Sequence, residues 1–321
     1  MSIILKGAWK PFRDAFESDM IKFRKHEINV EKEADLAHMI EAAKARELKN
    51  IKRALMIQDM RHKKRHKIIA SLPTVDYHAK HAKFTALRHP GTNNWIRTSP
   101  RFQSWLSSQL SDCLPCYGIP GSGKSVLAAS VANDLLASTQ DIVPIVCYYY
   151  CDYADTASLN SICLVASLIQ QLLVRLPLDC FDETFTCPYG EGISAPNFEA
   201  SAAFLRGILF HFKHVFFTID GLEELTHECQ HAILEFIDNL TTDSTANIKI
   251  FVTSRTEDRQ IKRALRNHEC IHLSTEDVSL DIGLFINAEV GATLVKRNPV
   301  LENERLKRAV IRALIAGAQG M

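Results

Sequence analysis

The sequence lacks any hydrophobic run that is long enough to cross a membrane. A membrane-spanning helix needs roughly 18 or more consecutive apolar residues, and no stretch of the 321 residues approaches that length. The opening run Met1–Leu5 is apolar, but Lys6 interrupts it too early for a secretion signal. We therefore expect a protein without a transmembrane segment that stays in the cytoplasm, where its nine cysteines are reduced core residues.

The chain also lacks a strong net charge, internal repeats and low-complexity tracts. Its net charge of +1 gives no argument for a nucleic acid partner, and we expect none. This small net charge is the sum of two parts of the chain with opposite net charge. Residues 1–89 carry 20 Lys and Arg against 11 Asp and Glu, whereas residues 90–321 carry 18 against 26. The first part is therefore basic and the second acidic, which suggests that they contact each other or different partners.

Residues 12–70 contain neither glycine nor proline, and good helix formers dominate them. The sequence therefore predicts helix over residues 7–70, within a helical N-terminal region that spans 1–85. An apolar stripe slips after Ala43, which favours a helical hairpin or short bundle over a long coiled coil. The stripe consists of Leu36, Ile40, Ala43, Leu48, Ile51 and Leu55.

A basic run, Arg61–Lys67, ends this helical region. His62 and His66 have the i,i+4 spacing of a shared metal site, but five Lys and Arg surround them and oppose a cation. We interpret the run as a solvated basic face. A contact with anionic lipid, with nucleic acid or with the acidic part of the chain is the alternative.

From residue 113 onward, short apolar runs alternate with helical segments. Nearly continuous Val, Ile, Phe and Tyr indicate strands that are buried on both faces, and the alternation predicts a five-stranded parallel sheet in an α/β fold. The expected strands are Cys113–Gly118, Val143–Cys151, Val215–Asp220, Ile248–Ser254 and Cys270–Leu273. The expected helices are Lys124–Ala137, Leu159–Leu176, His227–Leu240, Asp258–Asn267 and a segment from Asp277 onward.

A glycine-rich loop lies between the first expected strand and its helix. It reads GIPGSGKS and fits the pattern G-x-x-x-x-G-K-[ST] at every position. Glycines let backbone N–H groups wrap a polyphosphate, and the amino end of the helix adds partial positive charge. Lys124 would reach the β- and γ-phosphates, and Ser125 would ligate Mg²⁺. The expected nucleotide-binding residues are Gly118, Ile119, Pro120, Gly121, Ser122, Gly123, Lys124, Ser125 and Val126.

The run Val215–Asp220 ends in a carboxylate and has the Walker B form. On a neighbouring strand, Asp220 would hold the hydration shell of Mg²⁺ beside the phosphate loop. The sequence therefore predicts a metal site made of Ser125 and Asp220. Two further acids, Glu223 and Glu224, would orient an attacking water, or alternatively they only complement the dipole of the next helix.

The run Ile248–Arg255 comes one helix later and ends in Thr-Ser-Arg. A strand inserted between the loop strand and the acidic strand would bring Arg255 to the γ-phosphate, whose presence it would sense. An ordinary exposed arginine at a strand end is the alternative. Cys113 and Cys116 have metal-like spacing, but strand positions three apart face opposite sides, so we expect both in the core. The predicted catalytic residues are Lys124, Asp220, Glu223, Glu224 and Arg255.

The order of GIPGSGKS, FFTIDGLEE and IFVTSR resembles the NACHT class of STAND P-loop NTPases, and most closely fungal NOD-like receptors. A small residue after Asp220, followed by more acids, separates NACHT proteins from most other P-loop families. The family often has Asp where this chain has Glu223. The resemblance implies the three-layer P-loop NTPase fold. It divides the chain into a helical region at 1–85, a NACHT domain at 86–275 and the start of a helical subdomain at 276–321, truncated before a winged helix.

The residues before the first strand also resemble this family. His89–Thr92 and Ser99–Leu106 are similar to the lead-in of fungal NACHT proteins, which forms part of their adenine pocket. The resemblance implies that Gly91 and Thr92, with Trp95, lie near the base. The family usually carries another glycine near Asn93. The aromatic rings of this stretch suit core packing and base stacking equally well; they are Trp95, Phe102 and Trp105.

By resemblance, the protein is an ATP-dependent signalling switch with slow ATP hydrolysis. It would be closed with ADP at rest and homo-oligomeric with ATP, as in fungal non-self recognition and programmed cell death. The implied cofactors are ATP, ADP and Mg²⁺, and the implied partners are signalling proteins that bind the N-terminal helices. A non-hydrolysing adaptor is the alternative, and it gains if Glu223, Glu224 and Arg255 point away from the γ-phosphate. A P-loop kinase would need an Arg-rich lid, which is not evident between Val290 and Met321. A GTPase would need an N-K-x-D segment to read guanine, and the sequence contains none. Neither class of enzyme is therefore favoured.

Overall fold

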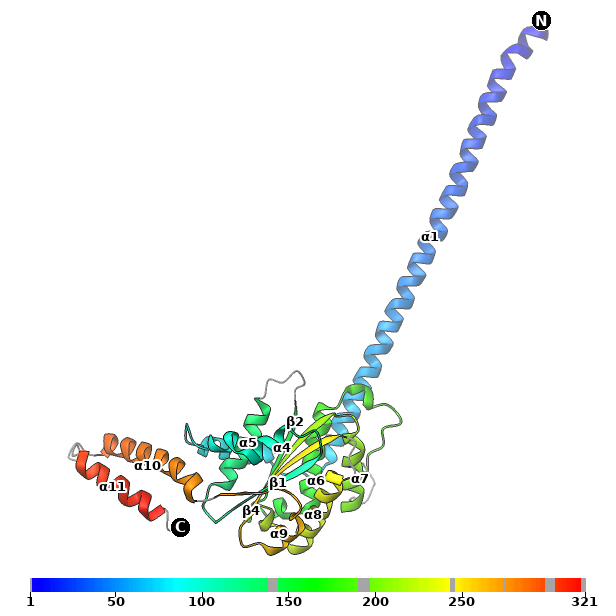
Figure 1. The fold of residues 1–321 in the computed structure, drawn as a ribbon. Helices are drawn as coiled ribbons and strands as arrows, with labels where there is room; N and C mark the ends of the chain where they lie inside the picture. The colour runs from blue at the N-terminus through cyan, green and yellow to red at the C-terminus, as the bar shows by residue number, and fades with distance from the viewer. Residues whose placement is uncertain are drawn as a thin grey trace. The chain divides into compact units, whose positions relative to one another are not determined.

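The structure is a computed structural model, and it describes residues 2–137, 144–189, 197–242, 246–273, 275–297 and 304–318. The chain divides into two compact units, Met1–Lys63 and Lys64–Met321. Figure 1 colours the elements from blue to red in chain order. Across the described ranges, no helix combines the length and apolar character that a membrane crossing requires.

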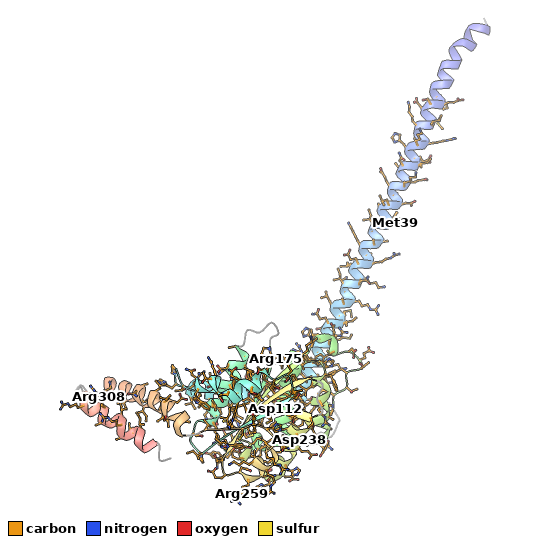
Figure 2. The ribbon with its side chains drawn as sticks, viewed as in Figure 1. Met39, Asp112, Arg175, Asp238, Arg259 and Arg308 are labelled. Carbon is orange, nitrogen blue, oxygen red and sulfur yellow. The ribbon has the colours of Figure 1, made fainter. Side chains whose placement is uncertain are left out.

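Helix α1 runs without interruption from Ser2 to Ser71, so the expectation of a hairpin or short bundle is wrong. Nothing in the backbone breaks the helix, because glycine and proline are missing over most of it. The slip in the apolar stripe rotates the stripe around a single helix and does not mark a turn. Most apolar side chains between Phe16 and Met60 are exposed, as for Leu48 at 54% and Met39 at 70% (Figure 2).

A parallel sheet of five strands forms the centre of the second unit, with the strand order β2-β3-β4-β1-β5 (Figure 1). This confirms the predicted α/β fold with a five-stranded parallel sheet. Strand β4 lies between β1 and β3, as predicted for the run that ends in Arg255. The strands are β1 (Asp112–Gly118), β2 (Ile145–Tyr150), β3 (His214–Asp220), β4 (Asn247–Arg255) and β5 (Ile271–His272).

Helices cover both faces of the sheet and enclose one apolar core on each side. One core receives α6 (Ser161–Arg175), α7 (Phe198–Leu209) and α8 (His227–Thr242), and the other receives α2 (Tyr77–Leu87), α4 (Pro100–Ser107) and α5 (Lys124–Leu136). Alternate strand residues enter the two cores. Cys113 and Cys116 of β1 are both fully buried, one in each core, as expected for core packing.

The remaining helices are short or follow the sheet. They are α3 (Trp95–Thr98), α9 (Arg259–Ala264), α10 (Thr275–Arg297) and α11 (Glu304–Ala318). The sequence patterns do not predict α3, α4 or α7, and they mark no separate helix at α2, most of which lies in the helical region expected over 1–85. Helix α2 begins where the Asp76 carboxylate accepts the Ala79 N–H at 2.8 Å.

Candidate functional site

The loop between β1 and α5 lies at one end of the sheet, and its residues Pro120, Gly121 and Gly123 are exposed. Gly121 and Gly123 have φ angles of 80° and 85°, which residues with a Cβ rarely adopt. A Cβ at either position would meet no heavy atom within 4 Å, so the outer side of the loop is open. Gly123 also begins α5, whose amino end carries partial positive charge. The loop therefore has the room and the polarity that a phosphate group needs.

Gly118, in contrast, is a glycine because the chain is crowded there. A Cβ at this position would lie 2.5 Å from Ser122 Oγ and 2.8 Å from Leu273 Cδ1. The Leu273 N–H donates to the Tyr117 carbonyl at 2.7 Å and holds the chain after β5 against the loop. Packing thus explains the first glycine of the motif, and backbone conformation explains the other two.

Lys124 lies folded over its own loop. Its Nζ donates to the carbonyls of Gly118 at 3.0 Å and Ile119 at 3.1 Å. The Ser122 hydroxyl is buried and has no hydrogen-bond partner among the described residues. An ammonium group and a hydroxyl both bond phosphate oxygens well, so the two side chains fit an anionic ligand in this loop.

Asp220 lies buried at the end of β3, beside the phosphate loop. Its carboxylate accepts a hydrogen bond from the Thr253 hydroxyl on β4 at 2.5 Å. The pKa of Asp220 is raised to about 6, chiefly by burial; the hydroxyls of Thr253 and Ser125 act to lower it, and the nearby Glu224 acts to raise it. Asp220 is thus close enough to Ser125, at the start of α5, to sense its hydroxyl.

Glu223 and Arg255 form an ion pair at the edge of the site. Arg255 Nε lies 3.4 Å from Glu223 Oε1, and the Glu223 side chain is only 7% exposed. Burial raises the pKa of Glu223, and its second oxygen, Oε2, has no hydrogen-bond partner in the described part of the chain. Arg255 also lies opposite Gly118 in the register of β4 and β1. The arginine is thus at the phosphate loop, but a carboxylate already engages it.

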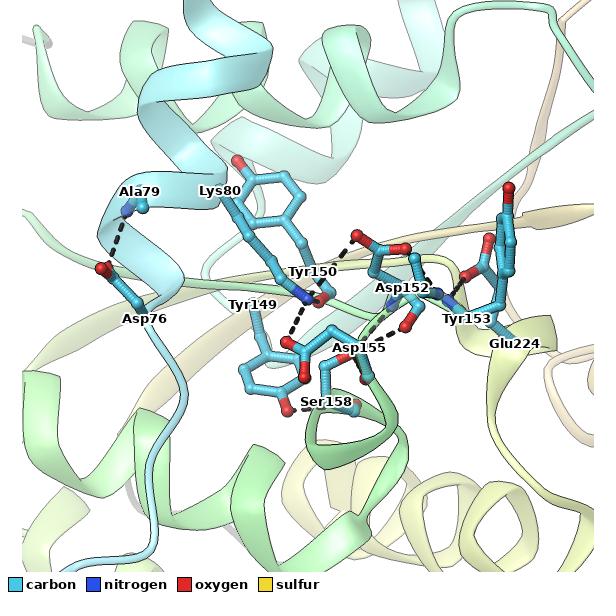
Figure 3. Close-up of polar contacts among 11 residues, drawn as sticks. Asp76, Ala79, Lys80, Tyr149, Tyr150, Asp152, Tyr153, Asp155, Ser158 and Glu224 are labelled. Carbon is cyan, nitrogen blue, oxygen red and sulfur yellow. Dashed lines mark hydrogen bonds and ion pairs between the residues drawn. The ribbon is translucent and has the colours of Figure 1, made fainter.

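Glu224 contacts the loop that follows β2. The Tyr153 N–H donates to Glu224 Oε2 at 2.6 Å (Figure 3). Gly221 has a φ angle of 74°, and a Cβ there would lie 3.1 Å from the Cys151 carbonyl. The small residue after Asp220 is therefore needed for the turn that brings the two glutamates to the site.

The segment before β1 lies against α5 and α10. Gly91 has a φ angle of 87°, and the buried Thr92 donates its hydroxyl to the His89 carbonyl at 2.7 Å. Asn93 has a φ angle of 62°, in the region that asparagine tolerates, where the resembling family usually carries glycine. Its side chain donates to Ser130 Oγ on α5 at 3.0 Å. The segment is thereby tied to the helix that starts at the phosphate loop.

The structure brings together the loop Gly118–Ser125, Asp220, Glu223 and Arg255, and it shows Glu224 turned toward Tyr153. Phe102 and Trp105 are buried in the core, whereas Trp95 is partly buried. Two groups at the site were not predicted from the sequence, the Thr253 hydroxyl and the Tyr153 N–H. The sequence does carry a hint of Thr253, because this residue belongs to the polar end of the run that also supplies Arg255. A backbone N–H from a distant loop leaves no sequence signal.

Residues 91–255, just over half of the chain, match the family described as "Nephrocystin 3, N-terminal". This range runs from Gly91, through the phosphate loop and Asp220, to Arg255. No curated protein matches the chain.

Among solved structures, the ORC2 protein of Aeropyrum pernix, described in ADPNP-ADP complexes, is similar to this chain. The two are 14% identical, and the match covers 63% of this chain and 50% of that one, with a TM-score of 0.36. The match thus extends over about half the length of the ORC2 chain.

Proposed function

The chain belongs to the nephrocystin 3 N-terminal family, and we propose that it is a P-loop NTPase that binds ATP and ADP and changes state with the bound nucleotide. The observation that carries this proposal is the position of the buried Asp220 carboxylate, at the end of β3, close enough to Ser125 at the end of the phosphate loop for that hydroxyl to lower its pKa. A hydroxyl and a carboxylate so arranged are the pair that holds Mg²⁺ beside a nucleotide in P-loop proteins.

The residues of the loop fit a nucleoside triphosphate. Its backbone N–H groups would hold the phosphates, and Lys124 would exchange its bonds to Gly118 and Ile119 for bonds to phosphate oxygens. Ser122 Oγ would gain the partner that it lacks among the described residues. Ser125 and Asp220 would hold Mg²⁺, which supplies neutralisation of the phosphate charge.

The acids beyond Asp220 suit slow hydrolysis of ATP. Glu224, held by the Tyr153 N–H, would orient a water. Arg255 would leave Glu223 for the γ-phosphate, which would make the ion pair a sensor of that phosphate. Gly91 and Thr92 would lie near the base, because their segment is bonded to α5.

The finer proposal is a signalling switch of the NACHT type, similar to fungal NOD-like receptors. Such a protein would be a homo-oligomer with ATP, would bind signalling partners through its N-terminal helix, and would act in the cytoplasm. The exposed apolar side chains of α1 support a partner-binding role for that helix.

A non-hydrolysing adaptor is a second candidate, and one observation favours it. Arg255 is paired with Glu223, and Glu224 is bonded to Tyr153, so all three side chains already have partners within the chain. An adaptor would bind nucleotide for stability and would act through α1.

The test is to identify the nucleotide that co-purifies with the protein, after denaturation and chromatography. Lys124→Ala is compared with Lys213→Ala, which removes the same charge from an exposed residue outside the loop. We expect ADP in the wild type and in Lys213→Ala, and none in Lys124→Ala. Added ADP should bind Lys124→Ala about 10–100-fold more weakly, because charged hydrogen bonds are lost.

The outcomes separate the candidates. ADP in the wild type supports the hydrolysing switch, whereas ATP supports the adaptor. Equal affinity of wild type and Lys124→Ala for ADP would overturn the assignment of the phosphate loop. An empty site together with no measurable binding of added ADP or ATP would overturn both candidates.

A further inference from the structure

The loop that follows β2 connects helix α2 with Glu224. It comprises residues 152–155 and leaves the sheet at Tyr150, next to the end of β3. On one side it contacts Lys80 of α2, and on the other its backbone contacts Glu224 (Figure 3). Neither the phosphate loop nor the segment before β1 takes part in these contacts, so α2 reaches the candidate hydrolytic site by a separate route.

Lys80 is the centre of the contact between α2 and the loop. Its Nζ lies 2.8 Å from Asp155 Oδ2 and 3.9 Å from Asp152 Oδ2, and it donates to the Tyr150 carbonyl at 3.5 Å. The Lys80 side chain is only 14% exposed. The Asp155 side chain is 38% exposed, so only the Lys80 end of the ion pair is sheltered, and removing Asp155 would leave this ammonium group poorly solvated. Lys80 accordingly holds the pKa of Asp155 below its usual value.

Internal hydrogen bonds make the loop one unit. The Asp155 N–H donates to the Asp152 carbonyl at 2.9 Å, and the Ala154 N–H donates to Asp152 Oδ1 at 2.9 Å. The buried Ser158 hydroxyl bonds the carbonyls of Asp152 at 3.1 Å and Asp155 at 2.7 Å. A shift of Asp155 would therefore move the backbone of residues 152–154 with it.

The loop acts on Glu224 through a backbone group. The Tyr153 N–H donates to Glu224 Oε2 at 2.6 Å, whereas the Tyr153 side chain is 76% exposed. The position of the Glu224 carboxylate thus depends on where the loop holds this N–H. Three consecutive links join Lys80 to Glu224: the ion pair with Asp155, the hydrogen-bonded turn Asp152–Asp155, and the hydrogen bond from the Tyr153 N–H to the Glu224 carboxylate.

We propose that Lys80 is a positioning residue of the hydrolytic site, which fixes the loop of residues 152–155 so that the Tyr153 N–H orients Glu224. This inference rests on the proposed function, because it assigns Glu224 to the orientation of water. It also assigns a role to α2: any partner that moves α2 would change the rate of hydrolysis without touching the nucleotide.

The first experiment compares Lys80→Met, Lys80→Arg and Lys83→Met in the full chain. Lys83 lies on the same helix and is exposed, so Lys83→Met removes the same charge away from the loop. We expect Lys80→Met to lower kcat for ATP about 10–100-fold, because small misplacements of a catalytic group cost this much. The affinity for ATP should stay within about twofold of wild type, Lys80→Arg should restore most of the rate, and Lys83→Met should behave as wild type.

A double-mutant cycle asks whether Lys80 acts through Glu224. If it does, Lys80→Met combined with Glu224→Gln should hydrolyse ATP no more slowly than Glu224→Gln alone. If the double variant instead loses kcat by the product of the two single losses, the proposal is overturned. It is also overturned if Lys80→Met binds ATP more weakly but keeps the kcat of wild type. If Lys80→Met fails to fold, Asp155→Asn replaces it in the cycle, since it weakens the same ion pair with a side chain of similar size.

Hydrogen exchange separates failure of this inference from failure of the proposed function. The backbone amide of Tyr153 should exchange at least about tenfold faster in Lys80→Met than in wild type or Lys83→Met, because its hydrogen bond opens more often. This readout does not require hydrolysis. If the wild type has no ATPase activity but Lys80→Met still speeds exchange at Tyr153, hydrolysis is overturned and the positioning of the Tyr153 N–H by Lys80 stands. If Lys80→Met leaves the exchange at Tyr153 unchanged, this positioning role is overturned.

Discussion

At the scale of single residues, the site depends on one buried carboxylate. Asp220 is 3% exposed, accepts a hydrogen bond from the Thr253 hydroxyl and lies near that of Ser125. Neutral hydroxyls cannot balance its charge, so the pKa is still raised to about 6, chiefly by burial. A bound cation would remove this cost, which is in line with the proposed magnesium site.

The stability of the protein without nucleotide or metal should reflect this carboxylate. The folded-state pKa of about 6 lies above the unfolded value of 3.8, so folding favours the protonated form. The unfolding free energy of wild type relative to Asp220→Asn should be highest below about pH 4, should fall by about 2–3 kcal/mol as the pH rises to about 6, and should then be constant. Urea titrations at several pH values measure this. The exposed Asp238→Asn (Figure 2) is the control, and a pH-independent difference for Asp220→Asn would contradict the prediction.

Two glycines of the phosphate loop should respond differently to alanine. Gly118→Ala would place a Cβ 2.5 Å from Ser122 Oγ and 2.8 Å from Leu273 Cδ1, so we expect a stability loss of about 1–3 kcal/mol from overpacking. Gly121→Ala meets open space and strains only a φ angle of 80°, which should cost about 1 kcal/mol. Thermal unfolding without nucleotide compares the two, and an equal or reversed order would show that the packing argument fails.

At the scale of elements, the sequence predicts most of the sheet and little of its support. Continuous apolar runs identify the strands. The Thr-Ser-Arg end of the run Ile248–Arg255 suggests a strand between the loop strand and the acidic strand, and β4 does lie between β1 and β3. Helix α7 is not predicted, because the pattern of Phe198–Leu209 stands apart from the strand–helix alternation on which the prediction depends. The ion pair of Lys80 and Asp155 is not predicted either, since 75 residues separate its partners and only the fold brings them together.

Helix α10 should support the segment that carries Gly91 and Thr92. The Asn93 N–H donates to Asp281 Oδ2 of α10 at 2.8 Å, and burial raises the pKa of Asp281. Asp281→Ala would leave that N–H without its partner, which costs about 1–3 kcal/mol locally. We expect faster hydrogen exchange at Asn93 and about 5–10-fold weaker ADP binding. Glu289→Ala, exposed on the same helix, should change neither quantity, and wild-type exchange at Asn93 in Asp281→Ala would rule out this support.

At the scale of the whole molecule, the two units differ in how much apolar surface they bury. Lys64–Met321 has two apolar cores around its sheet, whereas α1 leaves most of its apolar side chains between Phe16 and Met60 exposed. An isolated amphipathic helix gains little from propensity alone and usually needs a partner for its apolar face. The composition predicts the helix itself, but it does not reveal whether the slip in the stripe marks a turn.

Association of the protein should therefore depend on α1, and the stability of the second unit should not. Replacing Leu48, Ile51 and Leu55 together by glutamine should lower the average molar mass in light scattering at high protein concentration, because apolar surface drives association. Methionine at the same three positions keeps that surface and should keep the association. The unfolding temperature of the second unit should stay the same in both variants. Unchanged molar mass in the glutamine variant would show that these residues do not mediate contact.

The position of β1 in the sheet has a consequence for how the protein is made. Both neighbours of β1 come later in the chain, and Gly118 precedes the first residue of β4 by about 130 residues. At about 5–20 residues per second, the ribosome would need roughly 6–26 s to reach β4 after it has passed the phosphate loop. During that time β1 is an apolar segment without a paired edge, open to chaperones. A nascent chain should thus acquire its nucleotide site only after β4 has been made and inserts between β3 and β1.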